Sequence, residues 1–202
     1  MTRNVFINCA FDNQFEPIFR AIVFAVVRSG FQARCALETD DSAENRFAKI
    51  QRIVEQCQLG IHDISRTEVD GDPPLPRFNM PLELGLFLGA KRYGDLRQRR
   101  KRALVLDTEK YRYQKFMSDI AGQDIKSHGG DPSTALKDVV NWLRGHSKAS
   151  QFPGGNLVAK EFVAFEAALP RILDARSLSK DDMTFGDYVS IVAGWATGPA
   201  TT

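Results

Sequence analysis

Polar side chains that could bind a small ligand follow three strand-like segments of the chain and precede one helix. They include carboxylates and amides, which accept or donate hydrogen bonds, and an arginine that could hold a phosphate. The candidate binding residues are Asn8, Phe11, Asp12, Glu38, Ser65, Arg77, Asn79 and Met80. Two further acids, Asp63 and Glu83, are the candidates for chemistry.

Glu38 ends the second strand-like segment, where dinucleotide-binding folds often place an acid that binds ribose hydroxyls. A solvated loop acid is the equal alternative. No Gly-x-Gly-x-x-Gly or Gly-x-x-x-x-Gly-Lys-Ser/Thr motif follows the first segment. Hydride transfer and ATP hydrolysis therefore lose their main support.

Glu83 follows Pro81, a residue that suits the first turn of a helix because its missing N–H would have no partner there. The spacing predicts a helix that starts near Glu83. The helix dipole would then favour the carboxylate form. A simple stabilising acid at the helix start is the alternative.

The elements that position these residues alternate in type. Apolar runs predict strands over residues 4–10, 31–37, 59–65 and 103–107, and helical periodicity predicts helices over 15–29, 44–58 and from near Glu83. This alternation is typical of a doubly wound, flavodoxin-like or Rossmann-like α/β fold with a parallel sheet. In such sheets ligands bind at the carboxyl ends of the strands, where the candidate residues lie.

The second half of the chain reads as mostly helical, with helices predicted over residues 111–120, 132–146, 156–173 and 181–196. Only residues 124–126 offer a fifth strand, so we expect four or five strands. We expect one domain, in which residues 1–107 form the ligand-binding core and residues 108–197 form a helical elaboration packed on it.

The segment Ile-His-Asp-Ile-Ser at residues 61–65, followed by a proline-rich loop and by Asn-Met-Pro-Leu-Glu-Leu-Gly at residues 79–85, resembles the nucleoside 2-deoxyribosyltransferase-like superfamily. That superfamily is related to the Toll/interleukin-receptor-like NAD-cleaving domains. Residues 5–12 are also similar to its first strand, and the resemblance covers residues 4–107. The Ile-His-Asp and Phe-Asn-Met-Pro motifs also resemble those of an uncharacterised bacterial subfamily, from which no activity follows.

The resemblance implies hydrolysis or transfer at an N-glycosidic bond of a nucleoside, nucleotide or NAD-like ligand. Glu83 would attack the anomeric carbon or stabilise an oxocarbenium-like ion, because a carboxylate suits both roles. Asp63 would orient the substrate or donate a proton, with a structural acid that accepts loop N–H bonds as the equal alternative. No cofactor is implied.

Composition limits the other roles. The net charge is +2 and the three cysteines, Cys9, Cys35 and Cys57, lie singly among apolar residues, so we expect core packing in a reducing cytoplasm. No run approaches the roughly 18 apolar residues of a membrane span. We expect no metal site, because too few ligands lie near His128 and Asp124, which could instead pair on a helix.

Two further hypotheses remain open. A non-catalytic nucleotide-sensing or interaction module, in bacterial defence or signalling, would fit the sequence before Glu83, which is Arg-Phe-Asn-Met where the superfamily has Asp-Ser-Gly or Asn-Pro-Asn. A basic run at residues 97–102 could contact nucleic acid, although a solvated turn is favoured. The apolar C-terminal helices are expected to cover the sheet, with a homo-oligomer interface as the alternative.

Overall fold

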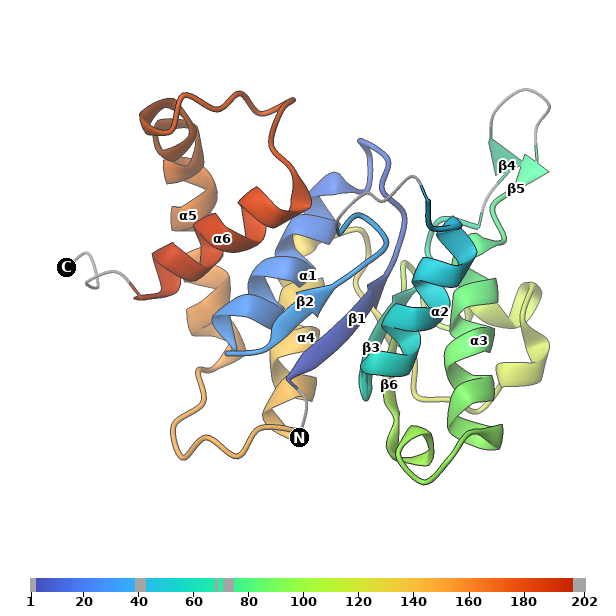
Figure 1. Ribbon diagram of the computed structural model, residues 1–202. Helices are drawn as coiled ribbons and strands as arrows, with labels where there is room; N and C mark the ends of the chain where they lie inside the picture. Colours follow the sequence, from blue (N-terminus) through green and yellow to red (C-terminus); the bar gives the residue numbers. More distant parts are fainter. Residues whose placement is uncertain (1–2, 39–42, 68, 71–74, 198–202) are drawn as a thin grey trace.

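The computed structural model describes residues 3–38, 43–67, 69–70 and 75–197 and contains one five-stranded parallel sheet (Figure 1). Its strands are β1 (Asn4–Asn8), β2 (Gln32–Arg34), β3 (Leu59–Asp63), β6 (Arg102–Asp107) and β7 (Lys126–Ser127). They follow the order β2-β1-β3-β6-β7. The predicted doubly wound α/β class is confirmed, and the weakly predicted fifth strand is present.

Helices cover both faces of the sheet (Figure 1). Helices α1 (Glu16–Arg28) and α4 (Pro132–Arg144) lie on one face, and α2 (Arg46–Gln56) and α3 (Asn79–Tyr93) lie on the other. Alternate residues of β1 pack against the two helical layers, because successive side chains of a strand point to opposite faces of the sheet. Val5 and Ile7 join the core under α1, and Phe6 packs with α2 and α3.

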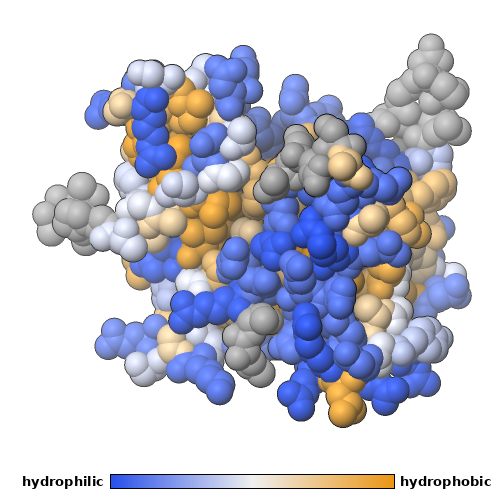
Figure 2. Space-filling model, viewed as in Figure 1, coloured by the Kyte–Doolittle hydropathy of each residue, from blue (hydrophilic) through white to orange (hydrophobic). Residues whose placement is uncertain are grey.

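Helices α5 (Gly155–Ala175) and α6 (Phe185–Thr197) form an outer layer that packs on α1 and α4 rather than directly on the sheet. The ring of Phe24 lies 5.3 Å from that of Phe162 and 5.1 Å from that of Phe165. Apolar side chains gather over α6, whereas the surface over β2 and α2 is hydrophilic (Figure 2). No helix within the described ranges is long and apolar enough to cross a membrane.

Three predicted segments differ from the structure. Residues 111–120 form two short 3₁₀ turns, η2 (Arg112–Lys115) and η3 (Ser118–Ile120), in place of a helix. The proline-rich loop leaves the main sheet as expected, but its described part forms a separate antiparallel pair, β4 (Val69–Asp70) and β5 (Leu75–Pro76). Helix α3 begins at Asn79, a full turn before Glu83.

The basic run before β6 contacts the end of α2. Lys101 is fully buried, and its ammonium donates hydrogen bonds to the carbonyls of Val54, at 2.5 Å, and of Cys57. Arg97 donates to the carbonyl of Glu55 at 2.8 Å. Cations suit helix C-termini because the last carbonyls lack intrahelical partners. Much of the predicted basic turn thus stabilises the fold itself.

Strand β3 is buried along its whole length and passes close to α3. A Cβ atom at Gly60 would lie 2.6 Å from Nε2 of His62 and 2.9 Å from ring carbons of Phe87. Neither ring has room to move, since both are fully buried. Glycine at position 60 therefore allows the two rings to pack against the strand.

We predict that Gly60→Ala lowers the free energy of unfolding by roughly 1–3 kcal/mol, the usual cost of overpacking. Urea unfolding measures this change in the free energy of unfolding as a shift of the midpoint at constant m-value. Gly89→Ala is the control, because a Cβ there meets nothing within 4 Å, and alanine should stabilise α3 by up to about 1 kcal/mol. Equal effects of the two substitutions would contradict the packing argument.

Candidate functional site

The direction in which the strands are added reverses between β1 and β3, since β2 lies on one side of β1 and β3 on the other. A sheet of this kind has its ligand crevice at that point, outside the carboxyl ends of the strands. Asn8 is the last residue of β1 and Asp63 the last residue of β3. Asn8 and Asp63 therefore end the two strands that border this crevice, and Asp12 and Ser65 lie in the segments that follow these strands.

Asn8 is buried and joins three elements. Its Nδ2 donates hydrogen bonds to the carbonyl of Met80, at 2.9 Å, and to Nδ1 of His62, at 3.1 Å. Since an amide nitrogen only donates, Nδ1 of His62 accepts and the ring proton lies on Nε2. Asn8 thus links β1 to β3 through His62 and to the start of α3 through Met80, and both of its amide hydrogens bind groups of the chain rather than a ligand. His62 is fully buried, as expected for a core histidine.

Asp12 forms an ion pair with two arginines at the mouth of the crevice. Its carboxylate accepts from Arg77 at 2.8 Å, from Arg66 at 3.1 Å and from the Phe15 N–H at 3.0 Å. Burial opposes ionisation, but the Phe15 hydrogen bond and the two guanidinium groups together lower the pKa of Asp12. Arg77 and Asp12, predicted separately as binding residues, are partners of each other.

Asp63 belongs to a buried cluster with Ser65 and His128. Its Oδ1 accepts the Ser65 N–H at 2.9 Å, and its Oδ2 lies 3.0 Å from Nε2 of His128. The Ser65 hydroxyl lies 3.0 Å from the same nitrogen. Nδ1 of His128 accepts the N–H of Gly130 at 3.0 Å. The cluster therefore ties the end of β3 to the loop between β7 and α4.

The arrangement of this cluster is not that of a serine nucleophile. In a catalytic triad the acid binds Nδ1 of the histidine, and the serine binds the basic Nε2. Here Nδ1 is occupied by a backbone donor, so in the neutral ring the proton sits on Nε2, which faces both Asp63 and Ser65. Nε2 has no lone pair with which to accept a proton from Ser65.

Glu83 lies in the second turn of α3 and is only partly exposed. Burial raises its pKa from 4.5 to about 7, and the charge of Arg46 only partly offsets this. The prediction that a helix start would favour the carboxylate is wrong, because α3 begins earlier and desolvation exceeds the dipole effect. Among the described residues, no hydrogen bond or ion pair reaches the Glu83 carboxylate.

Three acids lie close enough to the buried Cys9 thiol, which follows β1, to act on its pKa. Burial raises the pKa of Cys9 first, and Asp63, Glu83 and Asp12 raise it further. Arginines pair with Asp12, and hydrogen-bond donors bind Asp63. Glu83 has no hydrogen bond or ion pair of this kind within the described residues, and only the charge of Arg46 opposes its shift.

The remaining candidates are placed as follows. Glu38 pairs through both oxygens with Arg34, at 2.5 Å each, so the carboxylate expected to hold ribose is already bound. Phe11 packs edge-on against Phe19. Asn79 is exposed and does not cap α3, whose N-cap position is held by Phe78 without a side-chain hydrogen bond.

The three cysteines are free and buried, and burial raises the pKa of Cys35 and of Cys57 to about 12. Their predicted packing role is confirmed. Asp124 and His128 do not pair on a helix. Asp124 is exposed and binds Lys126, whereas His128 lies in the buried Asp63 cluster. Within the described residues, no group of three or more His, Cys, Asp and Glu side chains could hold a metal ion.

Comparison of the chain with protein-family models, curated proteins and solved structures finds no match. The geometry of this crevice is therefore the evidence for function.

Two residues of the site, His128 and Arg112, were not predicted as site residues, and the sequence offered His128 only as a partner of Asp124 on a helix. His128 follows β7, so the rule that strand ends carry ligands would have selected it had that strand been predicted with its true boundary. Arg112 pairs with the buried Asp107 at 2.7 Å and donates to the carbonyls of Ile64 and Ser65. It lies in a segment predicted as a helix, where nothing distinguished it.

We predict that Glu83→Gln stabilises the protein at pH 8. A carboxyl whose folded pKa lies above its unfolded value contributes stability below about pH 4.5 that is lost as the pH rises through 7. The difference between 4.5 and about 7 corresponds to roughly 3 kcal/mol. Thermal and urea unfolding at pH 5 and pH 8 should show an advantage of the variant that grows with pH.

The matched control is Glu44→Gln, which removes a surface carboxylate paired with Arg52 at 2.7 Å. It should not stabilise the protein at pH 8. A Glu83→Gln variant that is no more stable than the parent at pH 8 would show that the buried carboxylate carries no desolvation cost.

Proposed function

We propose that this protein cleaves or transfers at the N-glycosidic bond of a nucleoside, nucleotide or NAD-like ligand, with Glu83 as the reacting carboxylate. The single observation that carries the proposal is Glu83 itself, a partly buried acid near the ends of β1 and β3 with no hydrogen-bond or ion-pair partner among the described residues. Burial raises its pKa to about 7 against the opposing charge of Arg46. Strongly perturbed acids cluster at functional sites. The resemblance of residues 61–65 and 79–85 to the deoxyribosyltransferase-like superfamily supports the same residue.

The chemistry requires a negative group beside a carbon that becomes cationic. The carboxylate of Glu83 attacks the anomeric carbon as the C–N bond breaks, and the base leaves with the electron pair of that bond and takes up a proton. Water or an acceptor hydroxyl then displaces Glu83 from the sugar. Partial burial strengthens the attraction between the carboxylate and the developing positive charge. At neutral pH both the ionised and the protonated form of Glu83 are populated.

Asp63 supports this site as a positioning residue. Its side chain is 1% exposed, and both oxygens bind groups of the chain itself. It fixes the turn after β3, which borders the crevice. Contact with substrate would require these bonds to break, so the expectation that Asp63 donates a proton has less support than the expectation of a structural acid.

A second candidate function is binding without turnover, in a nucleotide-sensing module. The observation that favours it is that Asp12, Asp63 and Glu38 all bind partners within the chain. These acids then shape the crevice without taking part in chemistry. A tightly bound nucleotide that remains intact after long incubation would identify this function.

We predict that the purified protein releases free base from at least one member of a panel of nucleosides, deoxynucleotides and NAD. Glu83→Gln should lower kcat roughly 10²–10³-fold, because it removes the charge that stabilises the transition state. Chromatography of the released base measures the rate. Glu44→Gln, which removes a carboxylate already paired with Arg52, should keep parental activity. No base release from any substrate, or full activity in Glu83→Gln, would overturn the proposal.

A further inference from the structure

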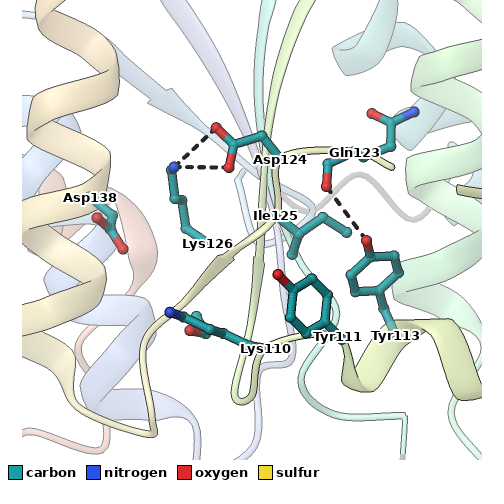
Figure 3. A pocket seen from close by; sticks show the side chains of 9 residues that line it. Lys110, Tyr111, Tyr113, Gln123, Asp124, Ile125, Lys126 and Asp138 are labelled. Carbon is teal, nitrogen blue, oxygen red and sulfur yellow. Dashed lines mark hydrogen bonds and ion pairs between the residues drawn. The ribbon is translucent and has the colours of Figure 1, made fainter. Parts of the chain in front are cut away.

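A hollow of about 470 Å³ opens at the edge of the sheet beside β7 (Figure 3). In the strand order, β6 separates β7 from β3 and therefore from the β1–β3 crevice. Its volume lies within the range of pockets that bind small molecules. It is formed by the segment after β6, by the approach to β7 and β7 itself, and by one residue of α4. The lining residues are Lys110, Tyr111, Tyr113, Gln123, Asp124, Ile125, Lys126, Ser127 and Asp138.

Two opposite charges in this hollow have no partner in the described part of the chain. No hydrogen bond or ion pair there reaches the ammonium of Lys110 or the carboxylate of Asp138. By contrast, Lys126 and Asp124 bind each other at 2.9 and 3.0 Å and so neutralise each other. Lys110 is exposed, whereas Asp138 is partly buried. Burial raises the pKa of the Asp138 carboxyl, and the nearby charge of Lys126 offsets part of this effect. Figure 3 shows Lys110, Lys126 and Asp138 on one side of the hollow.

The other side of the hollow is aromatic and apolar. Tyr111, Tyr113 and Ile125 lie there, and the Tyr113 hydroxyl approaches the carbonyl of Gln123 at 3.5 Å (Figure 3). Tyr113 is buried, whereas the side chain of Tyr111 is 68% exposed. An exposed ring beside two unpartnered charges provides a surface on which an apolar group can pack.

The backbone of Tyr111 is strained. Its φ of 63° is left-handed, a conformation that is unusual for a bulky residue and that glycine adopts without cost. The Tyr111 carbonyl accepts the Gln114 N–H at 3.1 Å in the turn η2. Glycine could form this turn equally well, so the turn explains the conformation but not the aromatic side chain. Strain of this kind concentrates at ligand sites.

We propose that this hollow binds an α-amino acid with an aromatic or large apolar side chain. Its ammonium binds Asp138, its carboxylate binds Lys110, and its side chain packs on Tyr111, Tyr113 and Ile125. A zwitterion is the class of ligand that can pair with both groups at once. A simple anion would leave the partly buried Asp138 without a partner, and a simple cation would make no use of the exposed ammonium of Lys110. This site is separate from the Glu83 crevice and does not depend on the function proposed there.

Titration of the full chain with L-phenylalanine, followed by calorimetry and by NMR, tests the proposal. We expect saturable binding that is at least about tenfold tighter than that of three analogues, each lacking one recognised group. N-acetylphenylalanine lacks the ammonium, phenylalaninamide lacks the carboxylate, and alanine lacks the ring. Absence of saturable binding by L-phenylalanine, L-tyrosine, L-tryptophan and L-leucine, or equal binding of the analogues, would overturn the proposal.

Single substitutions test each contact of the proposed ligand separately. Asp138→Asn and Lys110→Gln should each weaken L-phenylalanine binding at least about tenfold, whereas Lys115→Gln, an exposed cation outside the hollow, should leave it unchanged. Tyr111→Gly should weaken binding while raising the thermal midpoint by about 2–4 °C, because it removes the strain. Parental affinity in Tyr111→Gly, or Tyr111-dependent binding of a nucleoside monophosphate in place of amino acids, would show that the assigned ligand is wrong.

Discussion

The carboxamide of Asn8 holds together the three elements that border the crevice. Its two N–H groups reach β3 through His62 and α3 through the Met80 carbonyl. This requires a neutral His62, and burial together with the nearby Lys101 charge lowers the pKa of that ring to about 3. With the Met80 carbonyl held, α3 starts at a fixed height above the sheet. The second turn, and Glu83 with it, then falls beside the ends of β1 and β3.

Much of the fold followed from sequence because its strands and helices have clear periods of their own. Strands β1, β3 and β6 and helices α1, α4 and α5 lie close to their predicted ranges. Residues 111–120 do not form the predicted helix. Contacts of Tyr113 and Arg112 with other segments favour short 3₁₀ turns there. Helix α3 starts early because Asn8 engages Met80, a contact across 72 positions that no local pattern records.

The positions of the site residues could be predicted from the sequence, but their hydrogen-bond and ion-pair partners could not. Strand ends correctly identified Asp63, the last residue of β3, and Asp12, which lies in the segment after β1, as residues at the carboxyl end of the sheet. Glu38 does not end its strand, because β2 ends at Arg34 and a turn follows. The partners of the other two acids come from other segments, as Arg77 does for Asp12 and His128 for Asp63, and such pairs depend on the tertiary structure. The direction in which the pKa of Glu83 is shifted was not predicted, for a related reason. Sequence places an acid near a helix start, whereas burial by neighbouring elements determines its pKa.

The charges that the fold leaves uncompensated are informative because they cost stability. Asp12 and Glu38 each have an arginine partner, and such pairing is what partly buried acids require for folding. Glu83 and Asp138 have no comparable partner in the described chain, and burial raises the pKa of both. A ligand that supplies the missing partner binds the folded state alone and therefore stabilises it. The two places where this chain stands to gain most from a ligand are thus the β1–β3 crevice and the hollow beside β7.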